Sequence, residues 1–153
     1  MHGRSGREEK GRVIIQTYNP DNFAIEYSKK QDYELFYNTE ISLRKSLKYP
    51  PFCDIIMLGI SSNDENEVKK ISGLIHNFIK QKILKENVKI ILYNPVPCPI
   101  EKIKNKYRWR IIIKCIFDEN IIKLINDTFT ELKQSKKSDF CKVIIDINPN
   151  NML

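Results

Sequence analysis

The alternation of apolar and basic residues is strongest between Lys102 and Phe117, where the chain reads KIKNKYRWRIIIKCIF. From Tyr107 onward the odd positions carry aromatic or apolar side chains, while cations recur at the even positions. Because successive side chains of a β-strand point to opposite faces, this pattern predicts a strand with one apolar and one basic face. The apolar face must be buried in a core, and the basic face must meet water or anions.

Apolar periodicity also predicts the elements around this strand. Strands are predicted where apolar residues run together or alternate, at 52–61, 88–93, 107–117 and 142–147. Helices are predicted where apolar residues recur at helical spacing, over roughly 65–85 and 119–134. Asn63 or Asp64 is expected to cap the first of these helices, and Asn87 to end it. The resulting β-α-β-β-α-β order is typical of an α+β, ferredoxin-like fold, an antiparallel sheet with two helices on one face.

The segment before Phe52 has a different pattern. The apolar triplet Val13-Ile14-Ile15 predicts a short strand over residues 11–17. Amphipathic helices are predicted over 21–29 and 31–47, with Asn19 or Asp21 as the cap of the first. The sequence Tyr49-Pro50-Pro51-Phe52 is expected to end the second helix, because proline cannot continue one. Further along, the three prolines of residues 94–99 predict a stiff loop.

Composition favours acidic partners. The chain of 153 residues has 26 Lys and Arg against 19 Asp and Glu, a formal charge of +7. Such an excess indicates nucleic acid or an anionic membrane surface, although a general bias toward lysine would produce the same number. The four cysteines form no C-x-x-C pair, so a zinc site is not expected. No apolar run is long enough to cross a membrane, and we expect a soluble cytoplasmic protein without a membrane partner.

The basic strand and the segment before it are the main candidate binding site. Six cations fall within thirteen residues, beside one acid, Glu101. Such clusters contact the phosphates of nucleic acids. The predicted contacts are Lys102, Lys104, Lys106, Arg108, Arg110 and Lys114. Tyr107 and Trp109 would stack on bases if exposed, but the alternation puts them on the core face. The alternative is a solvated face of a lysine-rich protein.

Other candidates for chemistry are sparse. GRSGR at residues 3–7 is either a basic tail or a pair of arginines that meets a nucleotide phosphate. The only histidines are His2 and His76, and the sequence suggests no paired nucleophile and no P-loop. Asp146 is interpreted as a strand-end residue beside Asn148-Pro149.

Taken in combination, several of these motifs carry a resemblance. They are GRSGR followed by GRVIIQTYNP, FYNTEISLRKSLKYPPF at 36–52, NPVPCPI followed by YRWRIIIK, and the terminal VIIDINPNNML. With them the chain resembles the C-terminal region of the primosomal protein N′ (PriA) family, the DNA helicases of replication restart.

The resemblance implies a division of the chain and roles for its residues. Residues 1–18 would be the end of the second helicase lobe, 19–51 a helical linker, and 52–153 a ferredoxin-like DNA-binding domain. Arg4 and Arg7 match the arginines of the last helicase motif, which reach ATP in the full-length proteins as arginine fingers do. ATP with Mg and zinc belong to parts of the family's proteins outside this chain. The fragment is therefore expected to hold no cofactor and to hydrolyse no ATP.

The resemblance also implies partners. These are forked or single-stranded DNA, the single-stranded-DNA-binding protein and other primosome proteins, and Arg108 matches the family's Tyr-Arg dipeptide. Two other classes share the predicted topology: a stand-alone RNA-binding module of ribosomal type, and a ligand-binding regulatory module. A complete RNA-binding module would pair the strand around Val13–Gln16, whereas a helicase fragment would leave it without sheet partners.

Overall fold

The computed structural model describes residues 13–135 and 141–151. The chain divides into two compact units, one ending at Leu47 and one beginning at Lys48. The elements are α1 (Phe23–Lys30), α2 (Tyr33–Leu47), β1 (Asp54–Ser62), α3 (Glu65–Glu86), β2 (Ile91–Leu92), β3 (Val96–Ile103), β4 (Lys106–Cys115), α4 (Glu119–Gln134) and β5 (Lys142–Ile147).

The first unit consists of α1 and α2. Asn22 caps α1 by accepting a hydrogen bond of 2.9 Å from the Ala24 amide, so the predicted caps Asn19 and Asp21 were wrong. The Phe23 ring stacks on Phe36 with 6.2 Å between the centroids. Neither helix contains a buried residue. The two helices therefore contact each other through aromatic side chains, and neither contributes a buried residue to a core.

The predicted strand over residues 11–17 is not formed where the structure describes it. Residues 13–17 have no helix or strand, and Ile14 is 92% exposed. A strand needs neighbours to pair its backbone groups, and no strand of the described chain pairs with this segment. Residues 13–17 are therefore left without sheet partners within the described chain.

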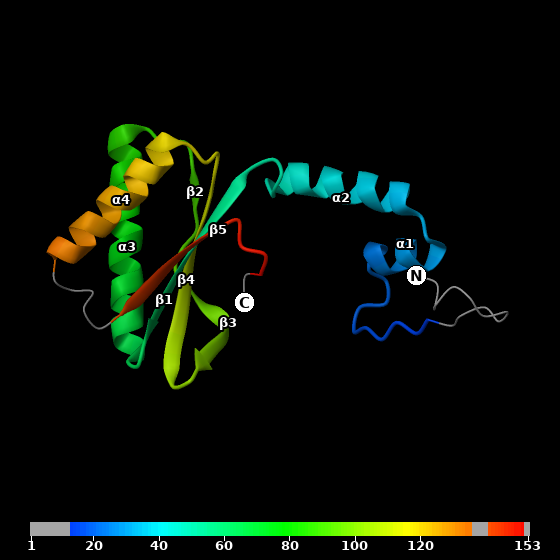
Figure 1. Cartoon of the computed structure of the whole chain (residues 1–153), viewed down its shortest axis with the longest axis horizontal. Helices are drawn as coiled ribbons and strands as arrows, with labels where there is room; N and C mark the ends of the chain where they lie inside the picture. Colours follow the sequence, from blue (N-terminus) through cyan, green and yellow to red (C-terminus); the bar gives the residue numbers. More distant parts are fainter. Residues whose placement is uncertain (1–12, 136–140, 152–153) are drawn as a thin grey trace, which may run out of the picture. The chain divides into compact units, whose positions relative to one another are not determined.

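The second unit is an antiparallel sheet with α3 and α4 on one face (Figure 1). The strand order is β2-β4-β1-β5, and β3 pairs with β4 beyond β2 on the same edge. Taking β2 and β3 as one interrupted strand, the order is that of a ferredoxin-like fold, as predicted. The second face of the sheet carries neither of these helices.

The core lies between the helices and the sheet. Its fully buried side chains include Ile56, Leu58 and Ile60 of β1, Ile111 and Ile113 of β4, Val68, Ile71, Ile75 and Ile79 of α3, and Leu124 and Leu132 of α4. Asp64 caps α3 by accepting from the Asn66 amide, and Asn87 ends it with a φ of 50°, both as predicted. The helices therefore begin and end where their cap residues stand.

The predicted loop over residues 94–99 is wrong from Val96 onward, because β3 begins there. Pro97 lies opposite Trp109 in the pairing with β4. Proline has no amide hydrogen to donate, so strands accept it at an edge, which is where β3 lies. The register then shifts between Pro97 and Lys102, so the two strands separate and rejoin.

A cationic hairpin and a sheet-face groove

A tight turn at Lys104-Asn105 joins β3 to β4. Both residues have positive φ, 48° and 63°, and the pair Ile103–Lys106 closes the turn. This is the geometry of a type I′ turn, whose twist matches that of the flanking strands. The turn places three exposed lysines together at one tip: Lys102, Lys104 and Lys106. We call these three residues the hairpin lysines.

Within the described residues, no carboxylate forms an ion pair with a hairpin lysine. The Lys102 ammonium lies 4.5 Å from the ring centroid of Tyr107 and 3.4 Å from its hydroxyl. These contacts orient Lys102 without neutralising its charge. The tip therefore presents concentrated positive charge to solvent, where phosphates can reach it.

Strand β4 divides its side chains as the alternation predicts. Tyr107 and Trp109 pack against the core, together with the buried isoleucines. Arg108 and Arg110 instead line a cavity of about 280 Å³ on the opposite face of the sheet. We call it the sheet-face groove; its lining is Met57, Gly59, Ile60, Ser61, Cys98, Arg108, Trp109, Arg110, Ile144, Asp146 and Asn151.

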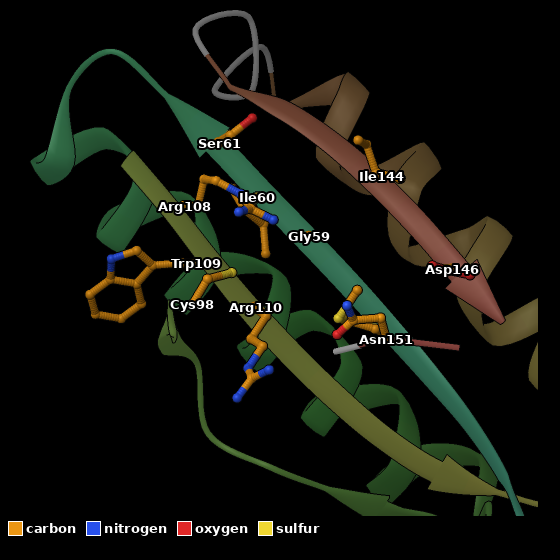
Figure 2. Close-up of a pocket in the computed structure, with 11 residues that line it drawn as sticks. Gly59, Ile60, Ser61, Cys98, Arg108, Trp109, Arg110, Ile144, Asp146 and Asn151 are labelled. Atoms are coloured by element: carbon orange, nitrogen blue, oxygen red, sulfur yellow. The ribbon is translucent and has the colours of Figure 1, made fainter. Parts of the chain in front are cut away.

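The two arginines leave β4 in different directions. In Figure 2 the side chain of Arg108 extends toward β1 near Gly59, whereas that of Arg110 extends away from β1. Burial raises the pKa of the Cys98 thiol between them, and the two guanidinium groups only partly oppose this. Cys98 therefore stays protonated at neutral pH, and the groove carries positive charge without a thiolate.

Lys114 does not share the setting of the other predicted contacts. Only 7% of its surface is exposed. Its ammonium lies 3.7 Å from the ring centroid of Tyr49 and 5.7 Å from that of Tyr93. The rings hold this cation against the sheet by cation–π attraction. We therefore leave Lys114 out of the interface proposed below.

A hydrogen-bonded clasp closes the same end of the sheet. Asp54 accepts hydrogen bonds of 2.9 Å from both the Phe117 amide and the Asn148 side chain. The Asn148 amide in turn donates to the Ile55 carbonyl at 2.7 Å. The bonds from Asn148 and Phe117 lower the pKa of Asp54. Asn148 thus has a structural role, which the sequence pattern Asp-x-Asn-Pro did not reveal.

The remaining candidates do not form a catalytic centre in the described chain. Arg4 and Arg7 lie outside the described residues. His76 is on α3, and burial lowers its pKa. Burial also raises the pKa of the Cys115 thiol to about 11. The described residues contain no group of three or more His, Cys, Asp or Glu side chains that could hold a metal ion.

Membrane insertion finds no support in the same residues: none of the described helices has both the length and the apolar character that crossing a bilayer requires. What the described chain does offer is a cationic tip beside the sheet-face groove.

Residues 45–150, which include the whole hairpin and all of the groove lining except Asn151, match the family model described as the primosomal protein N C-terminal domain. The chain belongs to this family. The resemblance drawn from the sequence motifs is thereby confirmed, and the RNA-binding and regulatory alternatives find no support.

Full-length relatives agree with the family assignment. The replication restart protein PriA of Bacillus subtilis is 32% identical over 154 residues, covering 100% of this chain and 19% of that protein. Its namesake from Synechocystis is 38% identical over 115 residues, or 74% of this chain and 14% of that protein. The replication restart protein PriA of Borreliella burgdorferi is 34% identical over 134 residues, which cover 87% of this chain and 20% of that protein. The chain thus spans a fifth or less of the length of these relatives.

Proposed function

We propose that this primosomal-protein domain binds forked or single-stranded DNA through the hairpin lysines together with Arg108 and Arg110. The observation that carries the proposal is the turn at Lys104-Asn105. It gathers three lysines at one exposed tip, and no described carboxylate pairs with them. Membership of the primosomal protein family supports this proposal, because replication-restart proteins act on DNA.

The charge arrangement suits a phosphate backbone. Each phosphate that a lysine or arginine neutralises releases condensed counterions, so binding weakens as salt rises. The hairpin lysines are flexible point charges, whereas Arg108 and Arg110 bring planar groups that can hold a phosphate with two hydrogen bonds. The tip would therefore supply affinity, and the arginines would position the strand.

In the longer protein, the same domain would serve an ATP-driven helicase that restarts stalled replication forks in the cytoplasm. Arg4 and Arg7 would act there as arginine fingers, and ATP with Mg and zinc would bind elsewhere in that protein. The single-stranded-DNA-binding protein and other primosome proteins would be its partners. The chain alone should show no DNA-stimulated ATP hydrolysis, and phosphate release above a no-protein control would contradict this.

The test of DNA binding is a charge reversal at the tip. Lys104→Glu with Lys106→Glu should weaken binding to forked DNA at least about tenfold at low salt. Loss of about two phosphate contacts should also reduce the slope of log affinity against log salt by roughly 1.5. Fluorescence anisotropy with forked and blunt duplex DNA, at two salt concentrations, measures both quantities.

A matched control makes the same change of net charge elsewhere. Lys80 and Lys85 are exposed on α3, on the helical side of the second unit. Lys80→Glu with Lys85→Glu should leave the affinity within about twofold of the unmodified chain, since no phosphate contact is removed. Equal losses in the two double variants would mean that net charge, and not the hairpin, attracts DNA.

A further inference from the structure

We propose that the sheet-face groove holds one unstacked nucleotide of single-stranded DNA over Gly59, and that this nucleotide gives the domain a preference for single strands over duplex. The inference rests on the proposed DNA binding and deepens it. The hairpin lysines attract the backbone of any DNA, whereas the groove selects DNA whose bases are unpaired.

Gly59 is the first observation. It lies in the middle of central strand β1, opposite Arg110 on one side and Ile144 on the other. Glycine within a strand costs roughly 0.5–1 kcal/mol relative to alanine. Nothing in the fold requires it, because a Cβ at this position would meet no atom within 4 Å and its φ is not in the left-handed region.

The missing side chain leaves the floor of the groove open. Neighbouring positions of β1 on the same face carry Met57 and Ser61, which line the groove with Gly59 between them. In strands, an isolated glycine marks a place where a ligand or another backbone comes close. The empty space above Gly59 is therefore suited to a flat group that lies against the sheet.

The walls of the groove fit a nucleotide. Arg108 reaches toward β1 near Gly59, as Figure 2 shows, and Asp146 and Asn151 also line the cavity. A guanidinium plane stacks on a base or holds a phosphate. A carboxylate accepts hydrogen bonds from the exocyclic amino groups of bases. The volume of about 280 Å³ lies just below the usual range for small-ligand pockets, roughly 300–1,000 Å³, as suits one nucleotide of a longer chain.

Only an unpaired base can enter this space. Within a duplex the bases are stacked and paired, and extruding one costs a few kcal/mol. A single strand pays much less, and base stacking on protein side chains contributes roughly 1–3 kcal/mol per base. The groove should therefore add to single-strand affinity and leave duplex affinity unchanged.

The test is to fill the floor with Gly59→Val. Valine favours strands, and a Cβ at Gly59 meets no atom within 4 Å. We expect affinity for a single-stranded oligonucleotide to fall about tenfold. The affinity for duplex DNA, which depends on the hairpin lysines, should stay within about twofold of its original value. Gly73→Ala on α3 is the matched control, because a Cβ there also meets no atom within 4 Å.

A base analogue gives a second readout that does not depend on affinity. The fluorescence of an oligonucleotide with a single 2-aminopurine should change when the unmodified chain binds it. Gly59→Ala should cause a smaller change, and Gly59→Val should cause none. Equal weakening of single-strand and duplex binding, or no weakening at all, would overturn the groove proposal. If the unmodified chain binds neither DNA, the proposed function itself fails. Circular dichroism melts confirm that each variant is folded.

Discussion

Strand β4 carries basic residues toward both of its ends, and the two ends have opposite surroundings. At the turn end, Lys104 and Lys106 are exposed, and no described carboxylate forms an ion pair with them. At the other end, Lys114 is only 7% exposed and lies beneath the rings of Tyr49 and Tyr93. The same alternating pattern thus produces an exposed cationic surface at one end and a packed cation at the other.

The difference arises from segments that lie far apart in the sequence. Tyr49 precedes β1, and the Tyr93 amide donates a 2.9 Å hydrogen bond to the Ile112 carbonyl of β4. Asp54 and Asn148 add the clasp at this end. The lesson is that a basic face is available for binding only where no other segment covers it. We call the two regions the turn end and the clasped end.

The largest expected effect is on stability at the clasped end. Lys114→Ala removes the cation between two rings and the apolar stem beneath them. It should lower the free energy of unfolding by about 2 kcal/mol. Urea denaturation followed by circular dichroism measures the loss.

Two further variants make this result specific. Lys114→Met keeps the apolar stem and should lose only about 1 kcal/mol or less, the cation–π part. Lys106→Ala, an exposed position on the same face at the turn end, should change stability by less than about 0.5 kcal/mol. If Lys114→Ala unfolds at the same urea concentration as the unmodified chain, the two ends do not differ as described.

A smaller effect of opposite sign is expected at the turn end. Lys104 has a φ of 48°, which costs an L-residue roughly 1–2 kcal/mol and glycine almost nothing. Glycine also has greater conformational freedom in the unfolded chain, and this entropy offsets part of the gain. The net effect of Lys104→Gly should be to stabilise the domain by about 0.5–1 kcal/mol. The same variant should bind forked DNA more weakly, with a salt slope reduced by about 0.8. A variant that is less stable, or that binds as before, would contradict the described turn.

The smallest effect concerns acid. Hydrogen bonds from Asn148 and Phe117 lower the pKa of Asp54 in the folded state. A lowered folded pKa means that the stability from Asp54 is present above its unfolded pKa and is lost as pH falls through the folded value. Between about pH 5 and pH 3, the unmodified chain should therefore lose more stability than Asp54→Asn. Thermal melts across this range give the two slopes, and parallel slopes would argue against the clasp.

The helices and the order of the elements could be predicted from the sequence. Residues 119–134 were predicted as a helix, and α4 spans Glu119–Gln134. Asp118 caps it by accepting from the Ile121 amide, and its apolar residues recur at helical spacing. Signals of this kind are local, so a single stretch of sequence contains them.

The errors at residues 11–17 and 94–99, and the burial of Lys114, depend on contacts that local patterns do not contain. The strand predicted over 11–17 had apolar residues but no partner strand in the described chain. The prolines of residues 94–99 indicated a loop, yet an edge strand accepts them. The burial of Lys114 depends on two tyrosines from other segments. Gly59 did carry a signal, an isolated glycine within a strand pattern, and this signal could have identified the groove.

The interrupted pairing of β3 has a consequence for how copies of the domain behave in solution. An exposed sheet edge can recruit a strand from a neighbouring molecule, which is a common route to aggregation. Here Pro97 and Pro99 cannot donate to such a strand, and the shift of register before Lys102 disrupts the ladder that it would need. The like charges of the hairpin lysines also repel a second copy. The features of the proposed DNA-binding edge should thereby disfavour strand pairing between identical domains.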